Sequence, residues 1–172
     1  CDNITTYLLQ NHGIEALIVA CNTATSAAIK HLREKFPFLI VIGTEPGIKP
    51  AILNTKSLNI GVLATPRTLK GDKYQLLVNE LSITKKVKLY EQACIGLVEQ
   101  IEKGEIDTKE TFDMLQKWLR PMKNENVDTI VLGCTHYPLV EDLIKKIMGN
   151  DITLIETGDA IAKRLKILSE EK

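Results

Sequence analysis

The sequence has no excess of charge of either sign, because 22 Lys and Arg residues balance 22 Asp and Glu residues. Without a net field, we expect no general attraction to nucleic acids or to anionic membranes. No apolar run approaches the length of a membrane-spanning helix, and none has the layout of a signal peptide. These absences predict a cytoplasmic protein with neither a nucleic-acid partner nor a membrane partner.

Cysteine is scarce and irregularly spaced. The four cysteines, Cys1, Cys21, Cys94 and Cys134, form no disulfide framework, which is typical of a reduced cytosolic protein. Cys134 and His136 could provide two metal ligands, but no CxxC pair or HExxH helix completes a zinc set. No glycine-rich phosphate loop is present either. The sequence therefore predicts no metal site and no nucleotide cofactor.

What the sequence does have is a repeated arrangement. Residues 16–23 (ALIVACNT) and 129–136 (TIVLGCTH) each run from an apolar segment directly into a cysteine, and a hydroxyl residue follows within two positions. A short apolar run bounded by polar residues indicates a buried strand of a parallel sheet. Open α/β sheets bind ligands where such strands end, so Cys21 and Cys134 are candidate reactive groups. Each segment continues with a helical pattern, a strand and a glycine-containing turn, which suggests an old duplication.

Strands and helices alternate along the chain. Strands are predicted at residues 15–20, 38–42, 58–64, 86–91, 127–133 and 152–155, with helices between them. The alternation predicts an α/β fold of two pseudo-symmetric, doubly wound domains with mainly parallel sheets. We expect the first domain to span residues 1–50 and to be completed by a C-terminal helix at 159–172, and the second to span residues 51–158. The first domain holds too few strands for a covered sheet, so we expect it to be incomplete at its N-terminus.

Two segments carry a family resemblance. Residues 20–24 (ACNTA) and 132–139 (LGCTHYPL) resemble the two signature motifs of the glutamate racemases, which belong to the aspartate/glutamate racemase superfamily. Residues 43–47, 61–65 and 93–99 are also similar, so the resemblance spans the chain. It implies cofactor-independent interconversion of L- and D-glutamate at a cleft between two domains, which supplies D-glutamate for peptidoglycan synthesis. It also implies a homodimer and, by analogy with some relatives, an interaction with DNA gyrase.

The resemblance assigns the chemistry to two thiols on opposite sides of the substrate α-carbon. Cys21 would take the α-proton from D-glutamate and Cys134 would take it from L-glutamate, with the other thiol acting as the acid. His136 would assist Cys134, and Glu99 matches an acidic residue that the family has near its active site. Substrate-binding groups are expected at Asn22, Thr23, Thr65, Thr135 and His136. Both cysteines are predicted at the start of a helix, where free N–H groups and the helix dipole favour a thiolate.

The sequence also departs from the family. Two of its motifs, Asp-Ser-Gly and Pro-Tyr-Gly, do not occur, so we expect the 172-residue chain to be weakly active or inactive. Two other functions remain open. One is racemisation of another amino acid or of a hydantoin within the same superfamily, and the other is binding of a partner without catalysis. Cys94 is expected to be a buried structural residue.

Overall fold

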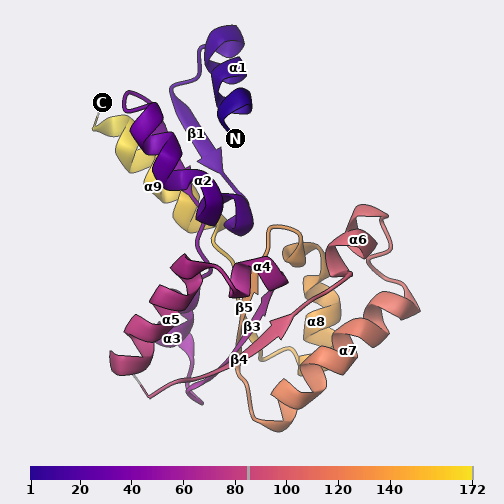
Figure 1. Ribbon diagram of the computed structural model, residues 1–172. Helices are drawn as coiled ribbons and strands as arrows, with labels where there is room; N and C mark the ends of the chain where they lie inside the picture. The colour runs from indigo at the N-terminus through magenta and orange to yellow at the C-terminus, as the bar shows by residue number, and fades with distance from the viewer. Residues whose placement is uncertain (85, 172) are drawn as a thin grey trace. The chain divides into compact units, whose positions relative to one another are not determined.

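The computed structural model describes residues 1–84 and 86–171, together with the side chains of all of these except residues 81–84. Contacts divide the chain into two compact units, of which unit 1 is Cys1–Glu45 with Thr157–Lys172 and unit 2 is Pro46–Glu156 (Figure 1). The sequence predicts boundaries at residues 50 and 158 instead. The first boundary differs because helix α3 (Ile48–Asn54) places side chains in the core of unit 2, where Ile48 is fully buried.

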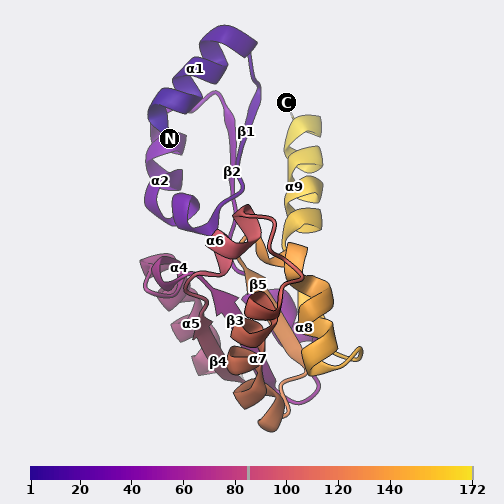
Figure 2. The ribbon, with the colours of Figure 1, turned by 90° about the vertical axis from the view of Figure 1, so that its right-hand side faces the viewer.

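Unit 1 is built on a two-stranded parallel sheet with helices on both sides. Strands β1 (Ala16–Val19) and β2 (Ile40–Gly43) pair over their full length. The helices described in this unit are α1 (Asp2–His12), α2 (Asn22–Lys35) and α9 (Gly158–Glu170), of which α9 contacts β2. Figure 2 shows α1 and α2 on one side of this sheet and α9 on the other.

The core of unit 1 follows from the alternation of side chains along β1. Leu17 and Val19 point toward α1 and α2, whereas Ile18 points to the other face and is 41% exposed. The most deeply buried member of this core is Leu32 of α2, which has no exposed surface. Burial of one apolar face therefore holds the helices on the sheet.

Unit 2 is a four-stranded parallel sheet in the order β4-β3-β5-β6. Its strands are β3 (Asn59–Ala64), β4 (Lys88–Ala93), β5 (Thr129–Gly133) and β6 (Thr153–Ile155). Its other helical elements are α4 (Pro66–Leu69), α5 (Asp72–Thr84), α6 (Leu97–Glu102), α7 (Lys109–Asn124), the 3₁₀ helix η1 (Tyr137–Val140) and α8 (Glu141–Met148). Figure 1 shows these helices distributed over both faces of the sheet.

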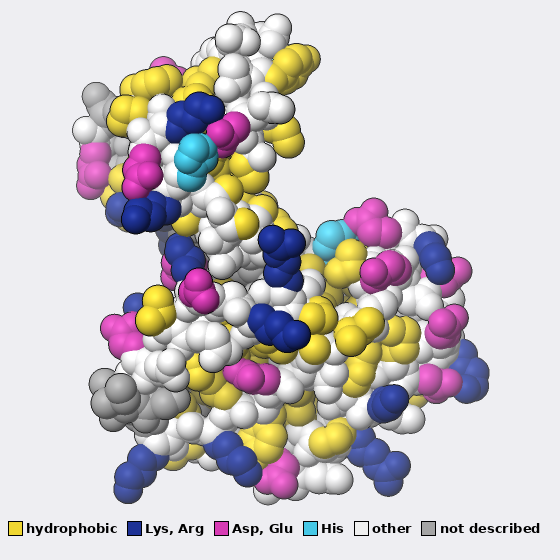
Figure 3. Space-filling view, viewed as in Figure 1, with side chains coloured by type: hydrophobic (Ala, Val, Ile, Leu, Met, Phe, Trp, Pro, Cys, Tyr) yellow, Lys and Arg dark blue, Asp and Glu magenta, His cyan; other side chains and the backbone are white. Residues whose placement is uncertain are grey.

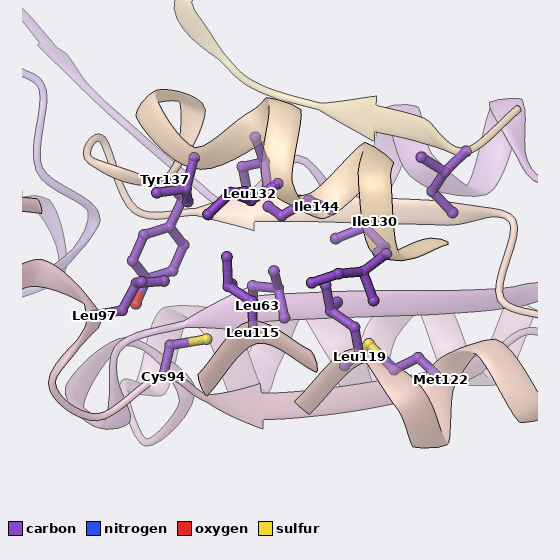
Figure 4. Packing of buried hydrophobic residues seen from close by; sticks show 14 of the residues in the cluster. Leu63, Cys94, Leu97, Leu115, Leu119, Met122, Ile130, Leu132, Tyr137 and Ile144 are labelled. Atoms are coloured by element: carbon purple, nitrogen blue, oxygen red, sulfur yellow. The ribbon is translucent and has the colours of Figure 1, made fainter. Parts of the chain in front are cut away.

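Two apolar clusters fill the two faces of this sheet. Ile60 and Val62 of β3 contribute to the cluster beneath α3 and α5. Leu63, on the opposite face of the same strand, belongs to the larger cluster with α6, α7 and α8, part of which Figure 4 shows. Because the central strands are buried on both faces, they read as nearly continuous apolar runs in the sequence.

The structure confirms the predicted α/β class with parallel sheets, and each of the six predicted strands is found within two residues of its expected ends. The helical pattern after Cys134, expected from Pro138 to Ile147, is found as two consecutive elements, the short 3₁₀ helix η1 after a turn and then α8. The turn is closed by a hydrogen bond from Tyr137 N to Cys134 O at 3.1 Å, three residues back rather than four.

The surface carries charges of both signs. Figure 3 shows Lys and Arg side chains interspersed with Asp and Glu side chains on the visible face of each unit. This distribution agrees with the equal numbers of basic and acidic residues. Across the described residues, no helix combines the length and the hydrophobicity that crossing a membrane requires.

Candidate active site

Cys21 lies where unit 1 passes from β1 into α2. It is the N-cap residue of this 14-residue helix, with an extended backbone (φ −99°, ψ 123°) and an exposed side chain. Asn22 and Thr23 form the first turn of the helix, and Asn22 is buried. The first turn contains no acidic residue, so nothing negative in it opposes a thiolate or a bound carboxylate.

Three residues follow neighbouring strands at the C-terminal edge of the sheet in unit 2. Ala64, at the end of β3, pairs with Ala93 of β4 on one side and with Gly133 of β5 on the other. The next residue on each strand is therefore Thr65, Cys94 or Cys134, and all three lie at the same edge. Strands lie about 4.8 Å apart, so Cys94 and Cys134 are separated by roughly two strand spacings, too far for a disulfide.

Gly133 is needed directly before Cys134 because the strands approach closely there. A Cβ atom at this position would lie 2.8 Å from Leu63 O and 2.9 Å from Ala64 Cβ. Neither of those atoms belongs to a flexible side chain that could move aside. A glycine therefore allows β5 to reach its end in register and to present the half-buried thiol of Cys134.

Cys134, His136 and Glu102 form a chain of contacts. Cys134 Sγ lies 3.7 Å from His136 Nδ1, and His136 Nε2 contacts the Glu102 carboxylate, to which it also forms an ion pair when protonated. A carboxylate only accepts hydrogen bonds, so a neutral imidazole in this position carries its proton on Nε2. The lone pair of Nδ1 then faces the thiol and can take its proton.

Glu102 was not among the residues that the sequence predicts. The resemblance points to Glu99, one helical turn earlier in α6, but the carboxylate that reaches His136 is that of Glu102. Both side chains are exposed, and Glu99 acts electrostatically on Tyr137. The only sequence signal for Glu102 is its three-residue spacing from Glu99, which places both carboxylates on neighbouring positions of the helix surface.

The threonine positions differ in what their side chains do. Thr65 Oγ1 caps α4 by accepting a hydrogen bond from Thr68 N at 3.2 Å, and it lies 3.0 Å from Thr68 Oγ1. Thr135 is exposed and lies between Cys134 and His136. Unit 2 thus gathers Thr65, Cys134, Thr135 and His136 at one edge of its sheet. Cys21, Asn22 and Thr23 belong to unit 1.

Cys94 is a structural residue, as the sequence predicts. Its side chain is 3% exposed and packs within the larger apolar cluster, near the fully buried Tyr137 and Leu97 in Figure 4. Burial raises the pKa of the Cys94 thiol to about 12, although contacts with Tyr137 and with the backbone of Ala64 oppose this rise. The thiol therefore stays protonated and does not act as a base.

Disulfides and metal-binding clusters are not found in the described residues. None of the four cysteines is in a disulfide there. Groups of three or more His, Cys, Asp and Glu side chains with the spacing of a metal site are also absent from that part of the chain.

Comparison with known proteins identifies the class to which this arrangement belongs. The family model of Asp/Glu/Hydantoin racemases matches residues 2–165. The chain therefore belongs to the Asp/Glu/Hydantoin racemase family.

The relatives described next are glutamate racemases. The chain is 76% identical over 172 residues to a glutamate racemase of Aliarcobacter butzleri and 66% identical over 170 residues to one of Sulfurovum sp.. It covers 66% and 64% of their respective lengths, so it spans about two thirds of these relatives.

Solved structures of glutamate racemases also superpose on this chain. The chain superposes with a TM-score of 0.87 on an Escherichia coli glutamate racemase in complex with L-glutamate and the activator UDP-MurNAc-ala, at 32% identity. That superposition covers 98% of this chain and 63% of the E. coli chain. A glutamate racemase isoform of Bacillus anthracis gives a TM-score of 0.79 at 35% identity, covering 97% of this chain and 62% of the other.

Proposed function

We propose that the protein interconverts L- and D-glutamate without a cofactor, using Cys21 and Cys134 as a pair of acid/base groups. Racemisation removes a proton from one face of the α-carbon and delivers one to the other face, which two thiols can do without moving. Each unit contributes one of these thiols from the same structural position, the C-terminal end of a parallel strand. The named relatives support glutamate as the substrate.

The observation that carries this proposal is the contact chain from Cys134 through His136 to Glu102. In the L-to-D direction, His136 Nδ1 accepts the proton of the Cys134 thiol, and the resulting thiolate removes the α-proton of L-glutamate. The electron pair of the broken C–H bond passes to the adjacent carboxyl group. The thiol of Cys21 then protonates the α-carbon from the other face, which leaves Cys21 as a thiolate. Glu102 stabilises the imidazolium and holds the ring in place.

On the Cys21 side, the start of α2 takes the place of a histidine. The N-terminal N–H groups and dipole of a 14-residue helix favour negative charge, whether on the thiolate or on a substrate carboxylate. In the D-to-L direction Cys21 is the base and Cys134 is the acid. Asn22 and Thr23 from unit 1, and Thr65, Thr135 and His136 from unit 2, are the proposed substrate-binding groups.

Aspartate and hydantoins remain the alternative substrates, because the family as a whole includes racemases of all three. The two relatives with the highest identities quoted above are both glutamate racemases, and this favours glutamate. We also propose a role in supplying D-glutamate for peptidoglycan, a cytoplasmic location and a homodimeric assembly, which the family resemblance implies. Two thiols that act as acid and base must stay reduced, and a reducing compartment such as the cytoplasm keeps them so.

The proposal is tested by optical assay of racemisation with L-glutamate, D-glutamate and L-aspartate, using a chain extended at its N-terminus by a segment that carries the two family motifs, Asp-Ser-Gly and Pro-Tyr-Gly. We expect racemisation of both glutamate enantiomers and its loss in Cys21→Ala and in Cys134→Ala. Cys1→Ala is the matched control, since Cys1 is an exposed cysteine outside the site. Activity toward aspartate alone would overturn the assignment of glutamate as the substrate. Full activity in either site variant would overturn the two-thiol mechanism.

A further inference from the structure

A buried hydroxyl network lies behind Cys21. Thr25 Oγ1 donates a hydrogen bond to Val19 O at 2.9 Å and accepts one from Thr44 N at 3.0 Å. Thr44 Oγ1 donates to the same carbonyl at 3.1 Å. Thr25 and Thr44 are 1% and 3% exposed, respectively, so water does not compete for these bonds.

The network joins three elements at the point where Cys21 emerges. Val19 is the last residue of β1, Thr44 directly follows β2, and Thr25 lies in the first turn of α2. Thr25 also acts through its backbone, because its N–H donates to Cys21 O at 2.8 Å. Thr25 thus holds this segment at two points, with its hydroxyl at Val19 O and its backbone N–H at Cys21 O.

Close packing fixes the rotamer of Thr25. A Cβ atom on Gly43 would lie 2.5 Å from Thr25 Cγ2 and 3.0 Å from Ile29 Cγ1. The absence of a side chain at the end of β2 therefore makes room for the threonine methyl group. With the methyl group against Gly43, the hydroxyl points to Val19 O. Serine would keep the hydroxyl and its two hydrogen bonds and lose only the methyl contact, whereas valine would keep the shape but lose both hydrogen bonds.

We propose that Thr25 is a positioning residue for Cys21, which fixes the turn between β1 and α2 so that the thiol faces the α-carbon of the substrate. This inference rests on the proposed racemase function. Cys21 is exposed, and no side-chain hydrogen bond caps the helix at its position, so the backbone sets where its sulfur lies. A small displacement of a reacting group is costly to catalysis even when the fold is intact.

The first test measures the turn itself and does not depend on activity. Amide hydrogen exchange is compared among wild type, Thr25→Val, Thr25→Ser and Thr5→Val. Thr5 is the matched control, since it is also a 1% exposed threonine of unit 1 whose hydroxyl donates to a backbone carbonyl, that of Cys1. We expect faster exchange in peptides covering residues 20–28 and 41–46 in Thr25→Val, largely restored protection in Thr25→Ser, and no change there in Thr5→Val. Unchanged exchange in Thr25→Val would overturn the proposal.

Thr25→Val should still fold. Thr44 N lies 3.2 Å from Val19 O and Thr44 Oγ1 also donates to this carbonyl, so no buried backbone group is left without a partner.

The second test is kinetic. The two enantiomers are equally stable, so kcat/KM must fall by the same factor in both directions, and we expect a fall of about 10- to 100-fold in Thr25→Val. The diagnostic is solvent deuterium in the unreacted enantiomer. With L-glutamate as the substrate, Cys134 still removes the α-proton, but Cys21 delivers a proton to the other face slowly. The incorporation of solvent deuterium into the remaining L-glutamate should therefore rise several-fold relative to the rate of racemisation. With D-glutamate no such rise is expected.

The two tests distinguish a positioning role of Thr25, a merely structural role of Thr25, and failure of the proposed racemase function. Equal exchange ratios for the two enantiomers, with or without a lower rate, would reduce Thr25 to a structural residue and overturn the proposal. Recovery of the wild-type ratio in Thr25→Ser supports it. If wild type does not racemise glutamate, the proposed function fails, and the hydrogen-exchange result alone then decides whether Thr25 holds the turn at Cys21.

Discussion

At the scale of single residues, the two candidate thiols are held in different ways. Cys134 faces a histidine that is itself held by a carboxylate. Cys21 caps a helix and has a backbone anchored by Thr25. In the proposed mechanism, the acid/base partner of Cys134 is therefore a side chain, whereas Cys21 relies on helix N–H groups. Changes at His136 and Glu102 should act on the Cys134 half of the reaction.

Glu102→Gln should lower kcat by about 10- to 100-fold with little effect on KM. The amide of Gln can donate to Nε2, which shifts the imidazole proton to Nδ1 and removes the base that faces Cys134. Steady-state racemisation of both enantiomers checks this expectation. Glu110→Gln, at an exposed position of α7, is the control. A larger loss in Glu99→Gln than in Glu102→Gln would instead assign the role to Glu99.

Asp128 connects the N-terminal ends of β3 and β5 and gives a pH prediction. Burial favours a higher pKa, but hydrogen bonds from Thr55, Ser57, Lys56 and Thr129 lower the pKa of Asp128 to about 2. A lowered folded-state pKa stabilises the protein above the unfolded value of about 3.9, and this contribution is lost as the pH falls toward 2.

Asp128→Asn should therefore lower the free energy of unfolding at pH 7 by about 1–2 kcal/mol, a value that allows for partial solvent screening. The difference from wild type should shrink between about pH 4 and 2. Urea unfolding across this range measures it, with the exposed Asp151→Asn as control. A difference that stays constant down to pH 2 would contradict the assignment.

The sequence predicts both cysteines as candidate reactive groups, because a strand ending in a cysteine is visible as a local pattern. It does not identify Glu102. Helix α6 offers Glu99 and Glu102 on adjacent positions, and the choice between them depends on how α6 packs against η1. That packing is a tertiary contact between segments more than 30 residues apart, which no local pattern encodes.

At the scale of elements, the central strand β3 does most to hold unit 2 together. It pairs with β4 and β5 and sends side chains into both apolar clusters. This double burial is why its sequence, NIGVLA, is so apolar and why the strand was predictable. The helical segment after Cys134 was less predictable, since Pro138 and the turn at Cys134 replace the expected first helical turn with a 3₁₀ helix.

Leu63→Ala should reduce the free energy of unfolding by about 2–5 kcal/mol, because it leaves a cavity in the larger cluster of unit 2. Leu63 has no exposed surface. Leu76→Ala is the matched control, since Leu76 is 69% exposed and should change stability little. Chemical denaturation followed by circular dichroism measures both. Equal effects of the two substitutions would contradict the assigned core.

At the scale of the whole molecule, the two units repeat one plan: a parallel strand that ends in a thiol, followed by helical structure and a second strand. The plan in unit 1 is built on two described strands and that in unit 2 on four. An arrangement that places one thiol in each unit suits a reaction that acts on the two opposite faces of an α-carbon. The repeated plan thus links the fold to the proposed chemistry.

The 172-residue chain by itself should racemise glutamate at least about tenfold more slowly than a chain extended at its N-terminus by a segment that carries the Asp-Ser-Gly and Pro-Tyr-Gly motifs of the family. It lacks the Asp-Ser-Gly and Pro-Tyr-Gly motifs of the family and spans about two thirds of its relatives. Parallel assays of the two proteins at equal concentration check this. Equal turnover would show that the missing motifs are dispensable.

The most direct test of the two-thiol account is to follow solvent deuterium into glutamate by proton NMR during the first few per cent of racemisation. Starting from either enantiomer, the account predicts that deuterium appears in the product enantiomer and hardly at all in the remaining substrate, because separate thiols serve the two faces. Deuterium appearing equally in both enantiomers from the start would indicate a single shared base. That result would contradict the account.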